Sequence, residues 1–162
     1  MSVRSAFTRL LVALLCLGSA QGGKLLVIPA DGSHWTGMKP LVEELGRRGN
    51  QVVVVIPEAS LSMGPSEHTT TLTFPVPYTK ESMTKNLEEN LGKFMEIDVS
   101  STAAKAMNYW ITMVMLSNVT MITCKSMLYD KVLMQTLPYD FDALLTDPFW
   151  PVGVIAGASL DI

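Results

Sequence analysis

Two residues in this sequence, His34 and Asp147, are of types that could work together as a general base. His34 lies just beyond the carboxyl end of one predicted strand, and Asp147 lies at the carboxyl end of a later one. If both strands belong to one parallel sheet, these side chains share the edge where open α/β sheets bind ligands. A carboxylate bonded to one imidazole nitrogen stabilises the imidazolium, while the other nitrogen can accept a proton from a hydroxyl. The placement suggests a His–Asp dyad, and a purely structural role for the histidine remains the alternative.

Other kinds of chemical site have little support in the sequence. His34, His68 and Cys124 are of types that bind metals, but no two of them stand three or four residues apart. No G-x-G-x-x-G follows the first predicted strand, and neither a G-x-S-x-G elbow nor a P-loop is present. We therefore predict no metal site and no nucleotide cofactor held by this chain.

A strand, a helix and a second strand are expected to position His34. Residues 24–30 (KLLVIPA) form a short apolar run typical of a strand buried on both faces. After a turn, Ser33 or Thr36 could cap a helix that ends near Gly49, which offers a left-handed stop. Residues 51–56 (QVVVVI) are β-branched and predict the next buried strand. A strand, crossover helix and strand predict an α/β fold with a parallel, Rossmann-like sheet.

The remaining elements follow from periodicity and turn chemistry. Residues 72–76 suggest a third strand, although Pro75 and Pro77 weaken it because proline cannot donate to a sheet ladder. Further predicted elements are a helix over 80–96, a helix over about 102–115, a strand over 141–147 and a helix over 152–160.

The second of these helices carries an apolar stripe that is rich in methionine. Met107, Trp110, Ile111 and Val114 fall on one side. We favour a core role for the stripe; an apolar substrate pocket or a membrane-facing patch are the alternatives. The apolar region 110–121 is expected to be too short and too polar to span a bilayer.

Composition places the chain among folded proteins of about one domain. Its 162 residues include 12 Lys and Arg and 15 Asp and Glu, for a net charge of -3, and 48% are hydrophobic. So high a hydrophobic content excludes a disordered charged tail. The lack of clustered basic residues excludes a nucleic-acid binder.

The N-terminus predicts entry into the secretory pathway. Arg4 and Arg9 precede the apolar stretch 10–17 and the small residues 18–20, the order of a signal peptide over residues 1–22. Cleavage would remove Cys16 and leave Cys124 unpaired in an oxidising compartment. Burial of that thiol is the favoured outcome; reactivity or a partner outside the chain are the alternatives.

Asn118 begins the acceptor sequence Asn118-Val119-Thr120 for N-linked glycosylation. The pattern is short and lies among apolar residues, so its use and its burial are both open at this point.

Several blocks of the sequence together resemble one enzyme family. The run 28–35 (IPADGSHW), residues 41–45 (LVEEL), residues 52–61 and the block 74–78 (FPVPY) precede the block 141–149 (FDALLTDPF). In this order and spacing they are similar to the start of vertebrate UDP-glucuronosyltransferases of the 1A type. The resemblance covers most of residues 23–162 and is weakest between about residues 86 and 139. Asn50 departs from it, because histidine is frequent at that position.

The resemblance implies a GT-B fold, in which two Rossmann-like domains face each other across a cleft. The N-terminal domain of such an enzyme binds a lipophilic acceptor, and the C-terminal domain binds the co-substrate UDP-glucuronic acid. His34 would deprotonate the acceptor hydroxyl with support from Asp147, and transfer would proceed with inversion. Ser33, Trp35 and Phe149 stand in the matching blocks and would contact the acceptor. The same resemblance implies the luminal side of the endoplasmic reticulum, a membrane anchor and pairing with family members.

The sequence ends at Ile162, partway through the acceptor-binding domain of such an enzyme. The donor-binding domain, transmembrane helix and cytosolic tail are expected to be absent, and the isolated chain is expected to be inactive because nothing in it would hold the nucleotide sugar. The favoured interpretation is an N-terminal part of a glucuronosyltransferase. The alternative is a short, non-catalytic luminal isoform that interacts with full-length relatives.

Overall fold

A four-stranded parallel sheet lies between two layers of helices in the computed structural model, which describes residues 22–96, 101–137, 140–148 and 150–162. The strands follow the order β3-β2-β1-β4. Their bounds are β1 (Lys24–Ile28), β2 (Gln51–Pro57), β3 (Thr70–Phe74) and β4 (Ala143–Thr146). All three strand pairs are parallel, so the predicted α/β class and Rossmann-like sheet are confirmed.

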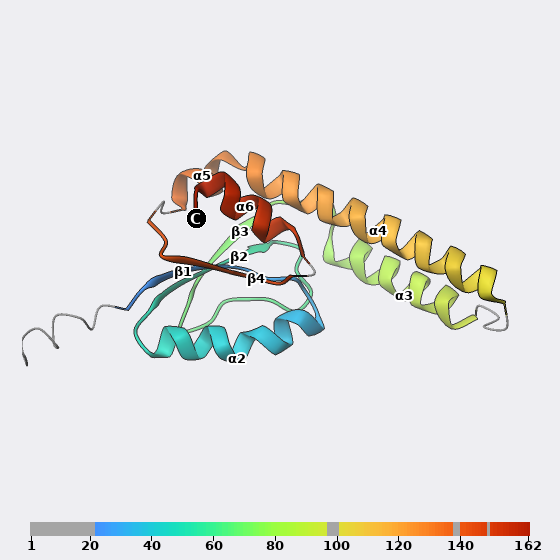
Figure 1. Ribbon diagram of the computed structural model, residues 1–162, viewed down its shortest axis with the longest axis horizontal. Coiled ribbons are helices and arrows are strands. Elements are labelled where there is room, and N and C mark those ends of the chain that lie inside the picture. Colours follow the sequence, from blue (N-terminus) through green and yellow to red (C-terminus); the bar gives the residue numbers. More distant parts are fainter. Residues whose placement is uncertain (1–21, 97–100, 138–139, 149) are drawn as a thin grey trace, which may run out of the picture.

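The helices divide between the two faces of the sheet, as Figure 1 shows. Helix α2 (Ser33–Arg47) covers one face. Helices α5 (Lys131–Thr136) and α6 (Val152–Leu160) and the end of α4 (Thr102–Tyr129) cover the other. Helix α3 (Lys80–Glu96) and the beginning of α4 extend beyond the sheet in that view.

Alternating residues of the central strands fill two separate cores. Val27 and Val54 join Trp35 and Val42 beneath α2. The side chains between them in β1 and β2 point to the opposite face of the sheet and pack against the helices there. This second core contains Leu26, Ile28, Val55, Phe74, Cys124, Met127, Leu133, Leu137, Val152, Ala156 and Leu160. Burial on both faces explains why β1 and β2 read as continuous apolar runs.

The start of α2 differs from the expected capping. The residue before the helix is Gly32, and neither it nor another side chain makes a capping hydrogen bond there. Ser33 already lies in the first turn, and Thr36 donates its hydroxyl to the Gly32 carbonyl at 3.2 Å. Gly32 has φ 75°, a left-handed value that suits glycine, so the backbone itself makes the sharp change from strand to helix.

Helix α4 is longer than its apolar stripe predicts. It continues to Tyr129 rather than ending near residue 115, and its last turns enter the core through Cys124 and Met127. The predicted burial of Cys124 is therefore confirmed, and that burial raises the pKa of the thiol.

The apolar stripe at the other end of α4 lies on the surface. Trp110 is 67% exposed, and Met107, Ile111 and Val114 are also exposed, so the core interpretation of this stripe is wrong. The helix has 28 residues and a mean hydropathy of 1.3 over its most apolar window, which meets the length and composition criterion for a membrane span. The expectation that this region is too short and too polar is thus corrected, although core helices of soluble proteins also meet that criterion.

Close packing of α6 on β4 yields a prediction about stability. A Cβ atom added to Gly153 would overlap the side chain of Thr146. We expect Gly153→Ala to lower the free energy of unfolding by about 1–3 kcal/mol, because a filled core tolerates added volume poorly. Gly37 in α2 is the matched control, since an added Cβ meets nothing within 4 Å there. Gly37→Ala should raise stability by about 0.4–1 kcal/mol. Denaturant unfolding measures both changes, and equal effects would contradict the packing argument.

Candidate functional site

His34 and Asp147 meet at the carboxyl edge of the sheet. Strands β1 and β4 are neighbours, with Ile28 paired to Thr146, so the residues that follow them emerge together. The Thr146 hydroxyl donates to the Ile28 carbonyl at 2.9 Å and fastens the two strand ends. The His34 Nδ1 atom lies 2.8 Å from the Asp147 Oδ2 atom. The predicted parallel arrangement and the predicted proximity of this pair are both confirmed.

The two members of the dyad differ in their access to solvent. The Asp147 side chain is 9% exposed, whereas the His34 side chain is 42% exposed. A buried carboxylate accepting from Nδ1 favours the tautomer that carries its proton there. It would also stabilise the imidazolium that forms when Nε2 accepts a proton. The exposed ring can therefore serve as a general base toward a molecule arriving at this edge.

Asp31 holds together the loops on which His34 depends. Its carboxylate accepts from the backbone N–H groups of Gly32 at 2.7 Å and Leu61 at 2.7 Å. It also accepts from the N–H of Ser62 at 3.1 Å and from the hydroxyls of Ser60 and Ser62. These bonds tie the segment entering α2 to the loop after β2, so they fix the turn from which His34 projects. Sequence reasoning treated Asp31 only as a turn residue, and the serines at positions 60 and 62 were the signal it missed.

Two opposing effects set the pKa of Asp31. Burial is the largest and acts to raise the pKa, but the hydrogen bonds from Ser62, Leu61, Gly32 and Ser60 together outweigh it and leave the pKa below the ordinary value. The folded protein therefore favours the ionised carboxylate more than the unfolded chain does.

This shift predicts a pH-dependent stability. The contribution of the Asp31 carboxylate is present above its unfolded pKa, near 4, and is lost as the pH falls through the lower folded value. We expect Asp31→Asn to cost about 1–3 kcal/mol at pH 7, because the loop N–H groups lose a charged acceptor. That difference should shrink below about pH 4. Denaturant unfolding at several pH values tests this, with Glu67→Gln on an exposed loop as the control. A difference independent of pH would contradict the role of the charge.

The residues predicted to contact an acceptor lie in different environments. Ser33 is exposed beside His34 in the first turn of α2. Trp35 is only 5% exposed and packs in the core beneath α2 with Val27 and Val42. Phe149 lies outside the described residues. The acceptor contacts of all three remain predictions.

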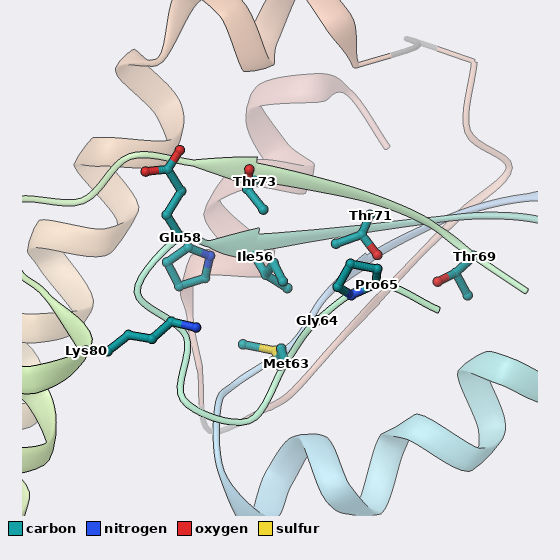
Figure 2. Close-up of a pocket in the computed structure, with 10 residues that line it drawn as sticks. Ile56, Glu58, Met63, Gly64, Pro65, Thr69, Thr71, Thr73 and Lys80 are labelled. Carbon is teal, nitrogen blue, oxygen red and sulfur yellow. The ribbon is translucent and has the colours of Figure 1, made fainter. Parts of the chain in front are cut away.

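Two hollows lie outside the dyad. One of about 300 Å³ lies along β3 and the end of β2, and Figure 2 shows Thr69, Thr71 and Thr73 on its β3 side, facing Met63 and Pro65. The Thr71 hydroxyl there is buried and has no hydrogen-bond partner within the described part of the chain. The other, about 350 Å³, is an apolar groove between α4 and α6 that includes Cys124, Trp150 and Ile155. Neither hollow is lined by His34 or Asp147.

The apolar groove begins close to the dyad along the chain. The Trp150 backbone N–H donates to the Asp147 carbonyl at 3.0 Å, so the turn that carries the carboxylate also carries a wall of the groove. Across the described residues, no group of three His, Cys, Asp or Glu side chains lies close enough to hold a metal ion.

Comparison with known proteins assigns the chain to a family. A family model described as "UDP-glucoronosyl and UDP-glucosyl transferase" matches residues 23–162. The chain belongs to this transferase family. It is 37% identical over 157 residues to UDP-glucuronosyltransferase 1A3 of Rattus norvegicus and 39% identical over 149 residues to UDP-glucuronosyltransferase 1A6 of Homo sapiens. These alignments cover 94% and 90% of this chain.

The alignments cover much less of the relatives themselves. The chain spans 29% of the rat 1A3 enzyme and 27% of the human 1A6 enzyme. No solved structure matches the chain at a comparable level of significance. The described α/β sheet is consistent with the N-terminal Rossmann-like domain of UDP-glycosyltransferases, as the sequence predicted.

Proposed function

We propose that this chain is the acceptor-binding part of an enzyme that transfers glucuronic acid from UDP-glucuronic acid to hydroxyl groups of small lipophilic molecules. The observation that carries the proposal is the 2.8 Å contact between His34 Nδ1 and Asp147 Oδ2 at the carboxyl edge of the sheet. Membership of a transferase family, together with similarity to UDP-glucuronosyltransferases, supports the reaction class.

In the proposed reaction His34 acts as the general base. Its Nε2 atom takes the proton of the acceptor hydroxyl while the acceptor oxygen forms a bond to the anomeric carbon of the sugar. The bond between that carbon and the diphosphate oxygen breaks from the opposite side, so UDP leaves and the anomeric configuration inverts. Asp147 stabilises the imidazolium through Nδ1. The proton then passes to solvent from the exposed side of the ring, which returns the base to its starting state.

The apolar groove beside Trp150 supports a lipophilic acceptor. Its lining is mostly Met, Leu, Ile, Trp and Cys, with Ser117 and Thr120 as the hydroxyl-bearing members. Such a surface would bind an apolar ring system, because removing apolar area from water supplies the binding energy without a demanding pattern of polar contacts. We place the acceptor between this groove and His34, with Ser33 and Phe149 as further contacts.

The proposed setting is the lumen of the endoplasmic reticulum, with a membrane anchor supplied by the full-length protein. The signal-like sequence at residues 1–22 supports entry into that compartment, although residues 1–21 lie outside the described part of the chain. Pairing with a second copy or with related enzymes belongs to the same proposal. The alternative of a non-catalytic luminal isoform remains a prediction.

A hybrid enzyme tests the proposed activity. Residues 23–162 would replace the matching segment of human UDP-glucuronosyltransferase 1A6, to which the chain is 39% identical. We expect the hybrid to release UDP and to form an inverted, β-linked glucuronide of a simple phenol. A hybrid that binds UDP-glucuronic acid but transfers nothing to any of several phenols would overturn the proposal. The 162-residue chain by itself is expected to give no UDP release with the same substrates.

A further inference from the structure

We propose that Asn118 carries an N-linked glycan and that this glycan covers the exposed apolar stripe of α4. The proposal is independent of the dyad and of the proposed transfer reaction. It rests on the place of Asn118 in the fold, which the sequence left open.

Asn118 lies at the centre of an exposed apolar surface. Its side chain is exposed near the middle of α4. Residues three and four positions away lie on the same side of a helix, so its neighbours are Val114, Met115, Met121 and Ile122. Met115 is half-buried and the other three are exposed, with Met121 at 56%, and Ile111 and Trp110 continue the surface toward the start of the helix. An asparagine thus projects outward from apolar side chains, and it begins the only N-x-S/T sequence in the chain.

The helix also constrains when the glycan can be attached. Residues two positions apart on a helix point in nearly opposite directions. Thr120 accordingly turns inward from Asn118, and its hydroxyl donates to the Leu116 carbonyl at 2.7 Å. The transferring enzyme must engage the asparagine and the threonine together, so transfer precedes closure of α4. The Asn118 amide nitrogen forms a bond to the anomeric carbon of a lipid-pyrophosphate oligosaccharide. The amide loses one proton, and the lipid pyrophosphate leaves.

A glycan at this position decides between two environments for α4. The helix is long and apolar enough to cross a membrane by length and composition. A hydrophilic oligosaccharide attached near its midpoint cannot lie in the hydrocarbon interior, so a modified helix stays in the aqueous lumen. The sugar would then shield Val114 and Ile122 from water and from other proteins. This gives the exposed stripe an occupant that the chain itself specifies.

Expression of the 162-residue chain in mammalian cells tests the site. Treatment with a glycosidase that removes N-linked glycans should shift its electrophoretic mobility by one glycan. Asn118→Gln and Thr120→Ala should abolish the shift, whereas Thr120→Ser should retain it because serine also completes the acceptor. A shift that persists in Asn118→Gln would overturn the assignment.

A second acceptor distinguishes failure of the site from failure to reach the lumen. Glu67→Asn creates a second N-linked glycosylation sequence, completed by His68 and Thr69, on an exposed loop. If this acceptor is modified in the Asn118→Gln background but Asn118 is unmodified in the original chain, the proposal is wrong. If neither position is modified, the chain is not luminal and the proposal is equally overturned. These results do not decide the proposed transferase activity, because the assay of UDP release needs no glycan on this chain.

The shielding role has its own measurement. Glycan removal from the purified, folded chain should increase the fluorescence of a dye that binds exposed apolar surface. The increase should be smaller in Val114→Ser, which removes part of the exposed stripe and leaves the Asn118-Val119-Thr120 sequence unchanged. An unchanged signal after glycan removal would overturn the covering of the stripe.

Discussion

Replacing His34 by alanine should reduce the kcat of the hybrid glucuronosyltransferase by about 10²–10⁴-fold, the usual contribution of a general base. The KM for the acceptor should change little, because the apolar groove that would bind it lies on α4 and α6 rather than on the imidazole. The reason is chemical: without Nε2 an acceptor hydroxyl must lose its proton to water while it attacks the sugar. Initial rates at saturating UDP-glucuronic acid, measured over a range of acceptor concentrations, separate the two constants.

The acidity of the acceptor separates deprotonation from positioning. A phenol acidic enough to be ionised at the assay pH needs no base, so His34→Ala should slow its conjugation far less than that of an aliphatic alcohol. Equal losses for the two acceptors would contradict a general-base role. His68→Ala supplies the matched control, because His68 lies on an exposed loop and its loss should leave both rates within about twofold.

The core of the fold could be predicted because its strands are buried on both faces. A strand with apolar contacts above and below reads as an unbroken apolar run, and β1 and β2 are such runs. The helix between them then requires a parallel pair, and parallel strands bring their carboxyl ends to one edge. This reasoning places His34 and Asp147 at the same edge of the sheet, although the residues next to each of them in sequence do not indicate that the two are close in space.

The helices that were misjudged depend on tertiary contacts rather than local preference. The second half of α4 contains Ser, Asn and Thr, which are poor helix formers. Thr120 and Thr123 nevertheless fit in the helix, because their hydroxyls donate to carbonyls four residues earlier. Burial of Cys124 and Met127 then stabilises this half against the sheet. Helix α5 was missed for a different reason: it has only six residues, too few to show a period, and the local cap in which Asp130 accepts from the Val132 and Leu133 backbone N–H groups was not recognised.

Periodicity also identified the apolar stripe of α4, but it did not reveal whether that stripe faces the core or the solvent. Trp110 and Val114 share a helix face whether that face packs on a core or projects from the molecule. The answer depends on α4 extending beyond the sheet, which is a property of the tertiary structure. The Asp31 network is similar, because it joins loops about thirty residues apart, and Ser60 and Ser62 signal it only once the fold has brought those loops together.

Replacing Asp147 by asparagine should lower kcat by a comparable factor of about 10²–10⁴ while leaving the fold intact. The amide has the size of the carboxylate, but it carries no charge to stabilise the imidazolium. It can also present its NH₂ group to Nδ1, which would move the ring proton to Nε2 and block the base. The effect should again depend on the acceptor and be small for an ionised phenol, since Asp147 is proposed to act through His34.

Asp140→Asn is the matched control, because that exposed carboxylate pairs with Lys24 on the surface and such pairs contribute little. A large kcat loss in Asp147→Asn for ionised and un-ionised acceptors alike would show that the carboxylate serves the structure of the edge and not the proton transfer.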